Sequence, residues 1–303
     1  MQPLGGSKEL LPLGWCEDAR GGQTRLRAIS EYLVERMLAA GADRLCFVVA
    51  AEKADLLRYY AQSAWAERVF FVVQPRPRGL CDAVFRAAPL IHPGEPVLIG
   101  LPDTVWHPLT AFAQALTPWV HLITFPVANP EEFDAVIPSP EEGARVLRVE
   151  VKAAGPAGRR VWGAITAPGA EFLGLAQFWR QRQGRDQYLG DLLNAWIAAG
   201  HGVSCDRLGT HYWDVGTPAG YARALGERAW EEPPGELALP VGGAPAPRRE
   251  VHAGPRIERA GRELPPSDPD DPQRGHDRDR EVDANDAGDL GAGKHPKQYG
   301  QRG

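Results

Sequence analysis

Two aspartates that each follow an apolar run are the residues of this chain best suited to catalysis. Asp103 follows the run 96–102, and Asp214 follows Tyr-Trp and precedes a Gly-Thr-Pro turn at 216–218. An acid at the C-terminal end of a buried strand faces the edge of an α/β sheet where metals and phosphates usually bind. Mg²⁺ prefers one or two carboxylates completed by phosphate oxygens and water, so the pair predicts a magnesium site in a nucleotide-handling enzyme.

Asp214 also has a simpler explanation. It stands just before Pro218, which suits the first turn of a helix, so it could instead cap that helix. The matching context of Asp103 favours the metal hypothesis. His211 has no metal-ligand spacing with the other histidines, and we expect it to be a surface neighbour of Asp214.

Helical and strand patterns alternate ahead of these acids. Amphipathic helices and buried strands are expected in turn at residues 28–40, 45–49, 54–62, 69–73 and 80–88, before a strand at Val97. Such alternation predicts a doubly wound, mostly parallel, Rossmann-like α/β sheet with right-handed crossovers.

Composition divides the chain into a folded part and a tail. Every Trp and Phe lies at or before Trp230, and beyond it Tyr299 is the only aromatic residue. The rest is rich in Pro, Gly, Arg and Asp and cannot bury enough apolar surface to offset the entropy of ordering it. We therefore expect one globular domain over residues 1–230 and a disordered, low-complexity tail over 231–303.

Charge, hydropathy and cysteine spacing exclude several classes of protein. A net charge of -5 argues against a general nucleic-acid or membrane-surface binder. The apolar stretches are far shorter than the roughly 18 residues that a membrane span needs, and no signal peptide is evident, so a cytoplasmic location is predicted. The four cysteines show no C-x-x-C spacing, which indicates neither a zinc site nor a redox pair. The sequence indicates no oligomeric state.

Four blocks in a fixed order resemble the sugar-1-phosphate nucleotidyltransferases, which make nucleoside-diphosphate sugars on a Rossmann-like fold. The resemblance is to glucose-1-phosphate thymidylyl- and uridylyltransferases and covers residues 3–225. The blocks are PLGGSKELLPLG at 3–14, QPRPRGLCDA at 74–83, LPD at 101–103 and WDVGTP at 213–218.

The resemblance implies a role for each charged residue of these blocks. Asp103 and Asp214 match the two metal aspartates of the family and would hold Mg²⁺. Lys8 and Lys152 would neutralise phosphate oxygens of the two substrates, a nucleoside triphosphate and a sugar 1-phosphate. Lys152 lies in Val-Glu-Val-Lys, which resembles the family's Glu-Lys-Pro element with one extra residue and without the proline.

Other residues are implied in binding the base and the sugar. Gln74 carries an amide that can pair with a base edge, and Gly79 allows close approach to a flat ring. Gly163 matches a glycine that brings the sugar near the backbone, although a packing role is the alternative. Asp186 and Asp191 fall where the family often places sugar-contacting acids, with a helix-start role as the alternative.

The implied reaction is attack by a sugar 1-phosphate oxygen on the α-phosphorus of the nucleoside triphosphate, with pyrophosphate leaving in line. Catalysis of this kind depends on positioning and charge neutralisation, so no nucleophilic side chain is expected.

The N-terminus departs from the family pattern. Family members carry a hydrophobic strand and a G-x-G-T-R loop before the segment that here begins at Met1. We expect the sheet to lack this usual first strand, the natural product to be longer, and the activity of the chain to be doubtful. Residues 21–26 imitate the loop but follow Lys8, and we expect them to be a linker into the helix at Ile29.

Two other classes of function stay open. One is a nucleotide-sugar-binding or regulatory protein that has lost turnover. The other is a nucleotide-sugar-dependent glycosyltransferase, which would need a D-x-D motif that the segment after Pro102 does not contain.

Overall fold

The structure is a computed structural model that describes residues 5–17, 22–115 and 117–231. All of these belong to one compact unit. The predicted tail lies, apart from Glu231, outside the described residues.

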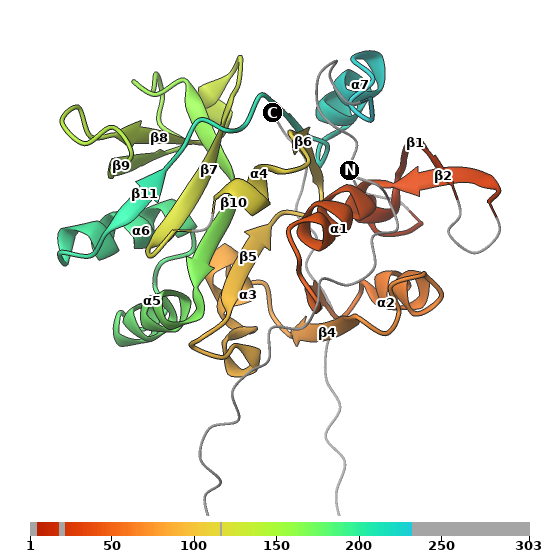
Figure 1. Cartoon of the computed structure of the whole chain (residues 1–303), viewed down its shortest axis with the longest axis horizontal. Helices are drawn as coiled ribbons and strands as arrows, with labels where there is room; N and C mark the ends of the chain where they lie inside the picture. The colour runs from red at the N-terminus through yellow and green to blue at the C-terminus, as the bar shows by residue number, and fades with distance from the viewer. Residues whose placement is uncertain (1–4, 18–21, 116, 232–303) are drawn as a thin grey trace, which may run out of the picture. The chain divides into compact units, whose positions relative to one another are not determined.

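Strands and helices alternate through the described part (Figure 1). The strands are β1 (Pro12–Glu17), β2 (Thr24–Ala28), β3 (Leu45–Ala50), β4 (Val69–Gln74), β5 (Pro96–Gly100), β6 (Thr104–His107), β7 (Val120–Pro126), β8 (Asp134–Pro138), β9 (Val146–Val151), β10 (Arg160–Pro168), β11 (Val203–Cys205) and β12 (His211–Asp214). The α-helices are α1 (Ile29–Ala39), α2 (Ala54–Ala61), α3 (Leu80–Phe85), α4 (Ala111–Gln114), α5 (Gly169–Gln181), α6 (Leu189–Ala198) and α7 (Pro218–Gly226), and the short 3-10 helices are η1 (Lys8–Leu10), η2 (Ala88–Leu90) and η3 (Pro130–Glu132).

The largest sheet has six strands in the order β11-β7-β10-β8-β9, with β5 also paired to β10. β5, β7, β8 and β11 run in one direction, whereas β10 and β9 run in the other. The predicted α/β class is confirmed, and most strands of this sheet share one direction, with β10 reversed at its centre. β3 and β4 form a separate parallel pair.

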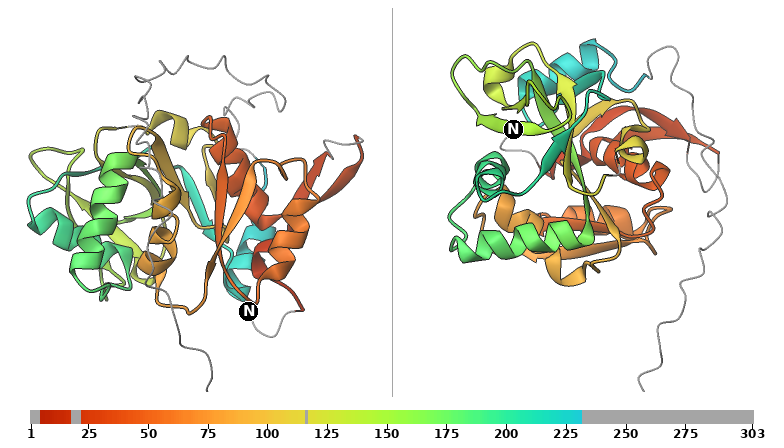
Figure 2. Two further views of the ribbon diagram at one scale, coloured as in Figure 1. Left: turned by 90° about the horizontal axis from the view of Figure 1, so that it is seen from below. Right: turned by 60° about the vertical axis from the view of Figure 1, so that its left-hand side comes forward.

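Helices cover both faces of the large sheet because side chains alternate along its buried strands (Figure 2). In β7, Val120 and Leu122 pack in a core with α3, α5 and α6. Ile123 and Phe125 of the same strand pack in a second core with α1 and α4. This two-sided cover is the doubly wound arrangement that the sequence predicts.

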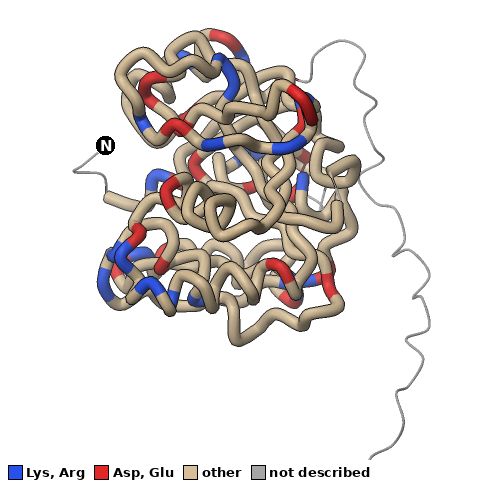
Figure 3. Tube along the Cα trace, turned by 90° about the vertical axis from the view of Figure 1, so that its left-hand side faces the viewer, with Lys and Arg blue, Asp and Glu red and all other residues tan. Residues whose placement is uncertain are grey.

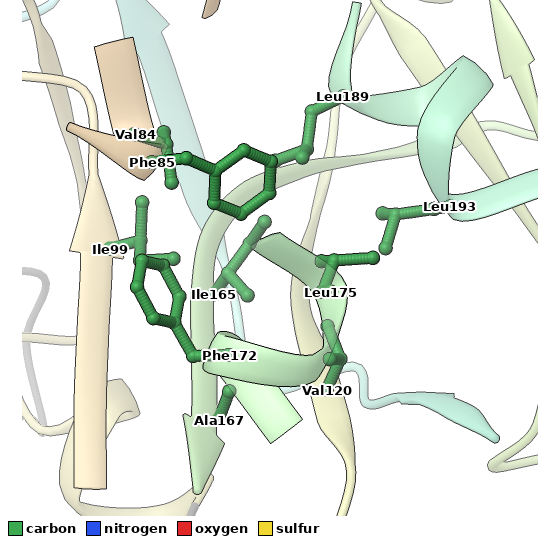
Figure 4. A pocket seen from close by; sticks show the side chains of 10 residues that line it. All are labelled: Val84, Phe85, Ile99, Val120, Ile165, Ala167, Phe172, Leu175, Leu189 and Leu193. Carbon is green, nitrogen blue, oxygen red and sulfur yellow. The ribbon is translucent and has the colours of Figure 1, made fainter. Parts of the chain in front are cut away.

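The core under α3, α5 and α6 is closely packed. Figure 4 shows Phe85, Phe172, Leu189 and other apolar side chains around a cavity of about 10 Å³. A space of this size is at the lower limit for one water molecule, so it is no substrate site.

β3 and β5 each have one free edge among the described residues. α1 lies across both, because Val34 packs with β3 and β4 while Leu33 comes within 2.4 Å of a Cβ built on Gly100 at the end of β5. Most residues of β3 are half-buried, whereas nearly all of β7 is buried.

Two predictions for the first hundred residues need correction. The linker expected over 21–26, of which residue 21 lies outside the described residues, is wrong for residues 24–26, because β2 pairs antiparallel with β1 in a hairpin with Trp15 opposite Leu26. Both side chains are more than half exposed, so the hairpin lacks the buried pattern that marks a strand in sequence. The helix expected over 80–88 ends at Phe85 and is followed by η2.

Charged positions are dispersed over the described part. In the view of Figure 3, Lys and Arg positions lie among Asp and Glu positions along the trace. None of the described helices combines the length and the apolar character that crossing a membrane requires.

Candidate active site

The two predicted aspartates lie together at one end of a short ladder. β6 and β12 pair antiparallel, with Asp214 opposite Thr104, the residue that follows Asp103. The backbone N–H of Val215 donates to the Asp103 carbonyl at 3.0 Å and extends the pairing by one residue. Register therefore places the two aspartates side by side.

Lys8 joins the aspartates from the N-terminal segment. Its Nζ lies 2.5 Å from Oδ2 of Asp103. Ser7 anchors the start of η1, because its backbone N–H and its hydroxyl each donate to the Asp55 carboxylate at 2.6 Å. We call Lys8, Asp103 and Asp214 the acid–lysine cluster.

A glycine makes this convergence possible. A Cβ at Gly216 would lie 2.7 Å from Oδ2 of Asp103, 2.9 Å from Oδ1 of Asp214 and 2.9 Å from Nζ of Lys8. The backbone N–H of Gly216 also donates to Oδ1 of Asp214 at 2.8 Å. Any side chain here would displace the charged groups, so the cluster requires glycine at this position.

The acid–lysine cluster is short of positive charge. Burial raises the pKa of Asp214, and neighbouring Asp103 adds to the increase, while the N–H of Gly216 and the Lys8 ammonium only partly oppose it. Burial would lower the pKa of Lys8, but Asp103, together with Glu9 and Asp214, more than compensates and the pKa is raised. An additional cation would relieve the repulsion between the carboxylates.

The donor set fits a small, hard cation. Mg²⁺ takes one or two carboxylates and completes its octahedron with phosphate oxygens and water. Within residues 5–17, 22–115 and 117–231, no three or more His, Cys, Asp or Glu side chains are grouped to hold a metal. A cation at this edge would thus have Asp103 and Asp214 as its protein ligands.

The helix-cap explanation of Asp214 is wrong. α7 begins at Pro218 as expected, but its N-cap is Thr217, whose hydroxyl accepts a hydrogen bond from the N–H of Gly220 at 3.0 Å. Asp214 accepts from Gly216 within the turn instead.

A second polar group lies where β8, β9 and β10 meet the start of α6. Lys152 follows β9 with a φ of 43°, and its Nζ lies 5.3 Å from the centroid of the Tyr188 ring. Its backbone N–H donates to the Phe133 carbonyl at 3.1 Å, which sets it beside Asp134. Nε1 of Trp162 donates to Oδ2 of Asp134 at 3.3 Å. We call Asp134, Lys152, Trp162 and Tyr188 the β8–α6 cluster.

Tyr212 lies within reach of both clusters. Its ring is buried and meets the Phe133 ring edge-on at 5.8 Å between centroids. Burial raises the pKa of Tyr212, and the carboxylates of Asp214, Asp103 and Asp134 raise it further. The carboxylates of the two clusters therefore act on a single aromatic side chain.

The loop after β4 brings Gln74 and Gly79 together. Nε2 of Gln74 donates to Oδ2 of Asp82 at 2.8 Å and to the Gly79 carbonyl at 3.3 Å. Gly79 has a φ of 90°, and a Cβ there would lie 2.7 Å from the carbonyl oxygen of Gln187. Internal contacts hold both residues in place, and base recognition by them stays a prediction.

Gly163 lies in β10, where the pairing with β7 is irregular. A Cβ there would come within 2.4 Å of the Tyr212 ring and 2.9 Å of the Phe125 ring. Packing accounts for this glycine, and its contact with a sugar stays a prediction.

The two acids near the start of α6 have different surroundings. Asp186 accepts two hydrogen bonds from the Arg182 guanidinium, each at 2.8 Å. Asp191 is exposed in the first turn of α6, and its charge adds to the effect of burial, which raises the pKa of Asp134. The structure therefore brings Asp191, and not Asp186, towards the β8–α6 cluster.

Asp134 and Tyr212 are site residues that the sequence analysis missed. Asp134 precedes an apolar run, whereas Asp103 and Asp214 each follow one. In the antiparallel β8–β9 hairpin, Asp134 pairs with Val151, so the start of β8 lies beside the end of β9. A search for acids at both ends of apolar runs would have found it.

No protein-family model matches the sequence, and no curated protein is detectably similar to it. Solved structures do match. A protein described as a glucose-1-phosphate thymidylyltransferase from Bacillus anthracis, in complex with sucrose, has a TM-score of 0.62 and 15% identity over 77% of this chain and 91% of its own. The chain has a sugar-1-phosphate nucleotidyltransferase-like fold.

Two further structures share this nucleotidyltransferase-like fold. A UDP-glucose pyrophosphorylase in complex with UDP-glucose has a TM-score of 0.57 and 18% identity, over 73% of this chain and 89% of its own. A UTP-bound UGPase from Acinetobacter baumannii has a TM-score of 0.53 and 20% identity, over 69% and 84% respectively. The resemblance that the four sequence blocks indicate is thus confirmed for the fold.

Proposed function

We propose that this protein transfers a nucleotidyl group from a nucleoside triphosphate to a sugar 1-phosphate and releases pyrophosphate. The observation that carries the proposal is the convergence of Lys8, Asp103 and Asp214 on Gly216. On a nucleotidyltransferase-like fold, two carboxylates and a lysine at the end of a strand suit the handling of a metal-bound triphosphate. The neighbours bind UTP, UDP-glucose or a sugar, which accords with such substrates.

Asp103 and Asp214 would hold Mg²⁺, which neutralises charge on the triphosphate when bound. Lys8 lies 2.5 Å from Asp103 and would stabilise phosphate oxygens next to the metal ligands. Lys152 would bind the phosphate of the sugar 1-phosphate from the β8–α6 cluster. Positioning and charge then account for catalysis, and no side chain forms a covalent intermediate.

Gln74 and Gly79 would bind the base. The amide nitrogen of Gln74 already donates to Asp82 and to Gly79, so its amide oxygen is the group available to a base edge. An oxygen acceptor suits the imide N–H of uracil or thymine.

The test is a matrix of nucleoside triphosphates against sugar 1-phosphates with Mg²⁺, with pyrophosphate release as the signal. We expect release with at least one pair, and loss of release with a chelator or with Asp103→Asn. If a folded, full chain bound both substrates but released no pyrophosphate from any pair, it would be a nucleotide-sugar-binding protein. Sugar transfer to an acceptor would indicate a glycosyltransferase.

A further inference from the structure

Asp134 is a partly buried carboxylate that the proposed mechanism does not use. It opens β8, and Nε1 of Trp162 donates to its Oδ2 at 3.3 Å. The start of α6 covers it closely, because a Cβ at Gly190 would lie 3.2 Å from the same oxygen. Among the described residues, no Lys, Arg or His forms an ion pair with Asp134 within 4.0 Å.

The surroundings leave this carboxylate with spare acceptor capacity. An ionised carboxylate offers about four lone-pair sites. Burial raises the pKa of Asp134, and the hydrogen bond from Trp162, the charge of Lys152 and the backbone N–H of Lys152 do not offset it. A buried acid in this condition gains from any further hydrogen-bond donor that enters the site.

Lys152 would orient a ligand, because a phosphate bound to it places the adjoining part of the ligand beside Asp134. The backbone N–H of Lys152 bonds to the Phe133 carbonyl, so the lysine and the acid are neighbours on paired strands. The side chain of Lys152 lies over the ring of Tyr188, which is 47% exposed. A ligand phosphate at Lys152 would therefore have both an acid and an accessible aromatic ring beside it.

The aromatic contacts connect this position to the proposed metal ligands. The rings of Phe133 and Tyr212 meet at 5.8 Å, and Tyr212 lies two residues before Asp214. Asp134 thus lies on the Lys152 side of the site, and the rings of Phe133 and Tyr212 lead from it towards Asp214.

We propose that Asp134 accepts a hydrogen bond from a ring hydroxyl of the sugar whose 1-phosphate binds Lys152, and so selects the sugar. This inference rests on the proposed function. The ligand class is a polyhydroxylated sugar 1-phosphate that offers an O–H donor near its phosphate. A site with an acceptor for a particular hydroxyl rejects an analogue without that hydroxyl, because its buried polar group is then unpaired.

The main test compares Asp134→Ala, Asp134→Asn and the unchanged chain. For the best sugar 1-phosphate, we expect Asp134→Ala to lower kcat/KM by about 100-fold, mainly through KM, while KM for the nucleoside triphosphate changes less than about threefold. Asp134→Asn keeps one acceptor oxygen and should recover part of the loss. If Asp134 had only a structural role, the loss would not be confined to the KM of the sugar 1-phosphate, and Asp134→Asn would not restore part of it.

Deoxy sugar 1-phosphates identify the hydroxyl. The unchanged chain should discriminate against one deoxy analogue, and Asp134→Ala should lose that discrimination. Asp206→Asn is the matched control, because Asp206 is a carboxylate already bonded to His121 at 2.8 Å and to the N–H of Leu208 at 3.0 Å. Equal KM for the sugar 1-phosphate in the unchanged chain and Asp134→Ala would overturn the inference.

Binding without turnover separates this inference from the proposed function. Calorimetry with a sugar 1-phosphate and no nucleotide should show binding to the unchanged chain and at least tenfold weaker binding to Asp134→Ala. That result supports the inference even if pyrophosphate is never released. Equal binding to both proteins, or no binding to the unchanged chain, overturns it.

Discussion

The two ends of the β6–β12 ladder carry opposite kinds of titratable side chain. At one end, Asp214 lies opposite Thr104 and beside Asp103; at the other, His211 lies opposite His107. The ladder is only four residue pairs long, so both ends belong to one small piece of backbone. What packs against each end decides whether its side chains are poised for a ligand or used for structure.

The histidine end is tied into the fold. Nε2 of His107 lies 3.2 Å from the Ala229 carbonyl, after the end of α7. Arg36 of α1 donates from Nε to the Trp106 carbonyl at 2.8 Å. Burial, with the charge of Arg36, lowers the pKa of His107 to about 4, so its ring is neutral at pH 7. At this end, backbone carbonyls accept the hydrogen bonds of the His107 and Arg36 side chains.

The acid end has more negative than positive charge, because Asp103 and Asp214 share one lysine, Lys8. Burial and Asp103 raise the pKa of Asp214 even though Lys8 is present. Hydrogen bonds to backbone carbonyls tie the histidine end into the fold, whereas the acid end keeps a repulsion that a bound cation would relieve. Substitutions at the acid end should therefore change activity, and substitutions at the histidine end should change stability.

The largest effect is expected for Asp103→Asn. Loss of one of two metal carboxylates should lower the rate of pyrophosphate release on the order of 10³-fold. The melting temperature should change little, because the substitution also removes repulsion with Asp214. His211→Asn, on an exposed residue at the other end, is the control and should keep full activity. Retained turnover in Asp103→Asn would show that the metal assignment is wrong.

The next largest effect is acid destabilisation through His107. The unfolded histidine binds a proton near pH 6.5, whereas the folded one does so only near pH 4, so stability is complete above pH 6.5 and falls between these values. The loss should reach about 3 kcal/mol at pH 4. Urea unfolding at pH 7 and pH 4 measures it. His107→Gln should lose less unfolding free energy over the same pH interval. Equal losses in both proteins would show that protonation of His107 is not the cause.

Lys8→Ala should lower turnover by about 10- to 100-fold, because one of the charges on the phosphates is lost. In the ion pair of Lys8 with Asp103, the lysine side chain is 34% exposed and the aspartate side chain 21%. Removal of this solvent-screened pair should cost less than about 1 kcal/mol of stability. Steady-state rates and thermal unfolding measure the two effects. A large loss of stability with unchanged turnover would show that Lys8 supports the fold and does not act on the phosphates.

The smallest effect tests the cap that replaces Asp214 at α7. Thr217→Ala removes the acceptor for the N–H of Gly220 and should cost about 1 kcal/mol, or roughly 2–4 °C in melting temperature. Thr210→Ala, at the histidine end, loses no cap but only an exposed 3.2 Å contact with His211, and should stay within about 0.5 kcal/mol. Equal melting temperatures for the two variants would show that the cap has no effect.

Local pattern accounts for much of the fold. α1, β3, α2 and β4 lie within a few residues of their predicted bounds, because helical spacing and short apolar runs are properties of the segment itself. The hairpin of β1 and β2 was missed because only Leu13 and Ala28 in it are buried. Its strands exist through pairing with each other, which no single segment encodes.

The sequence by itself determined the α/β class, the candidate aspartates and the order of the four blocks, since these depend on composition, period and residue type. Tertiary structure alone decided that Lys8 reaches Asp103, that Gly216 admits three charged groups, and that Asp134 joins Lys152. These contacts between distant residues depend on strand register and on the direction in which each strand runs in the sheet. A shift of one residue would turn a side chain to the opposite face, and local pattern sets neither quantity.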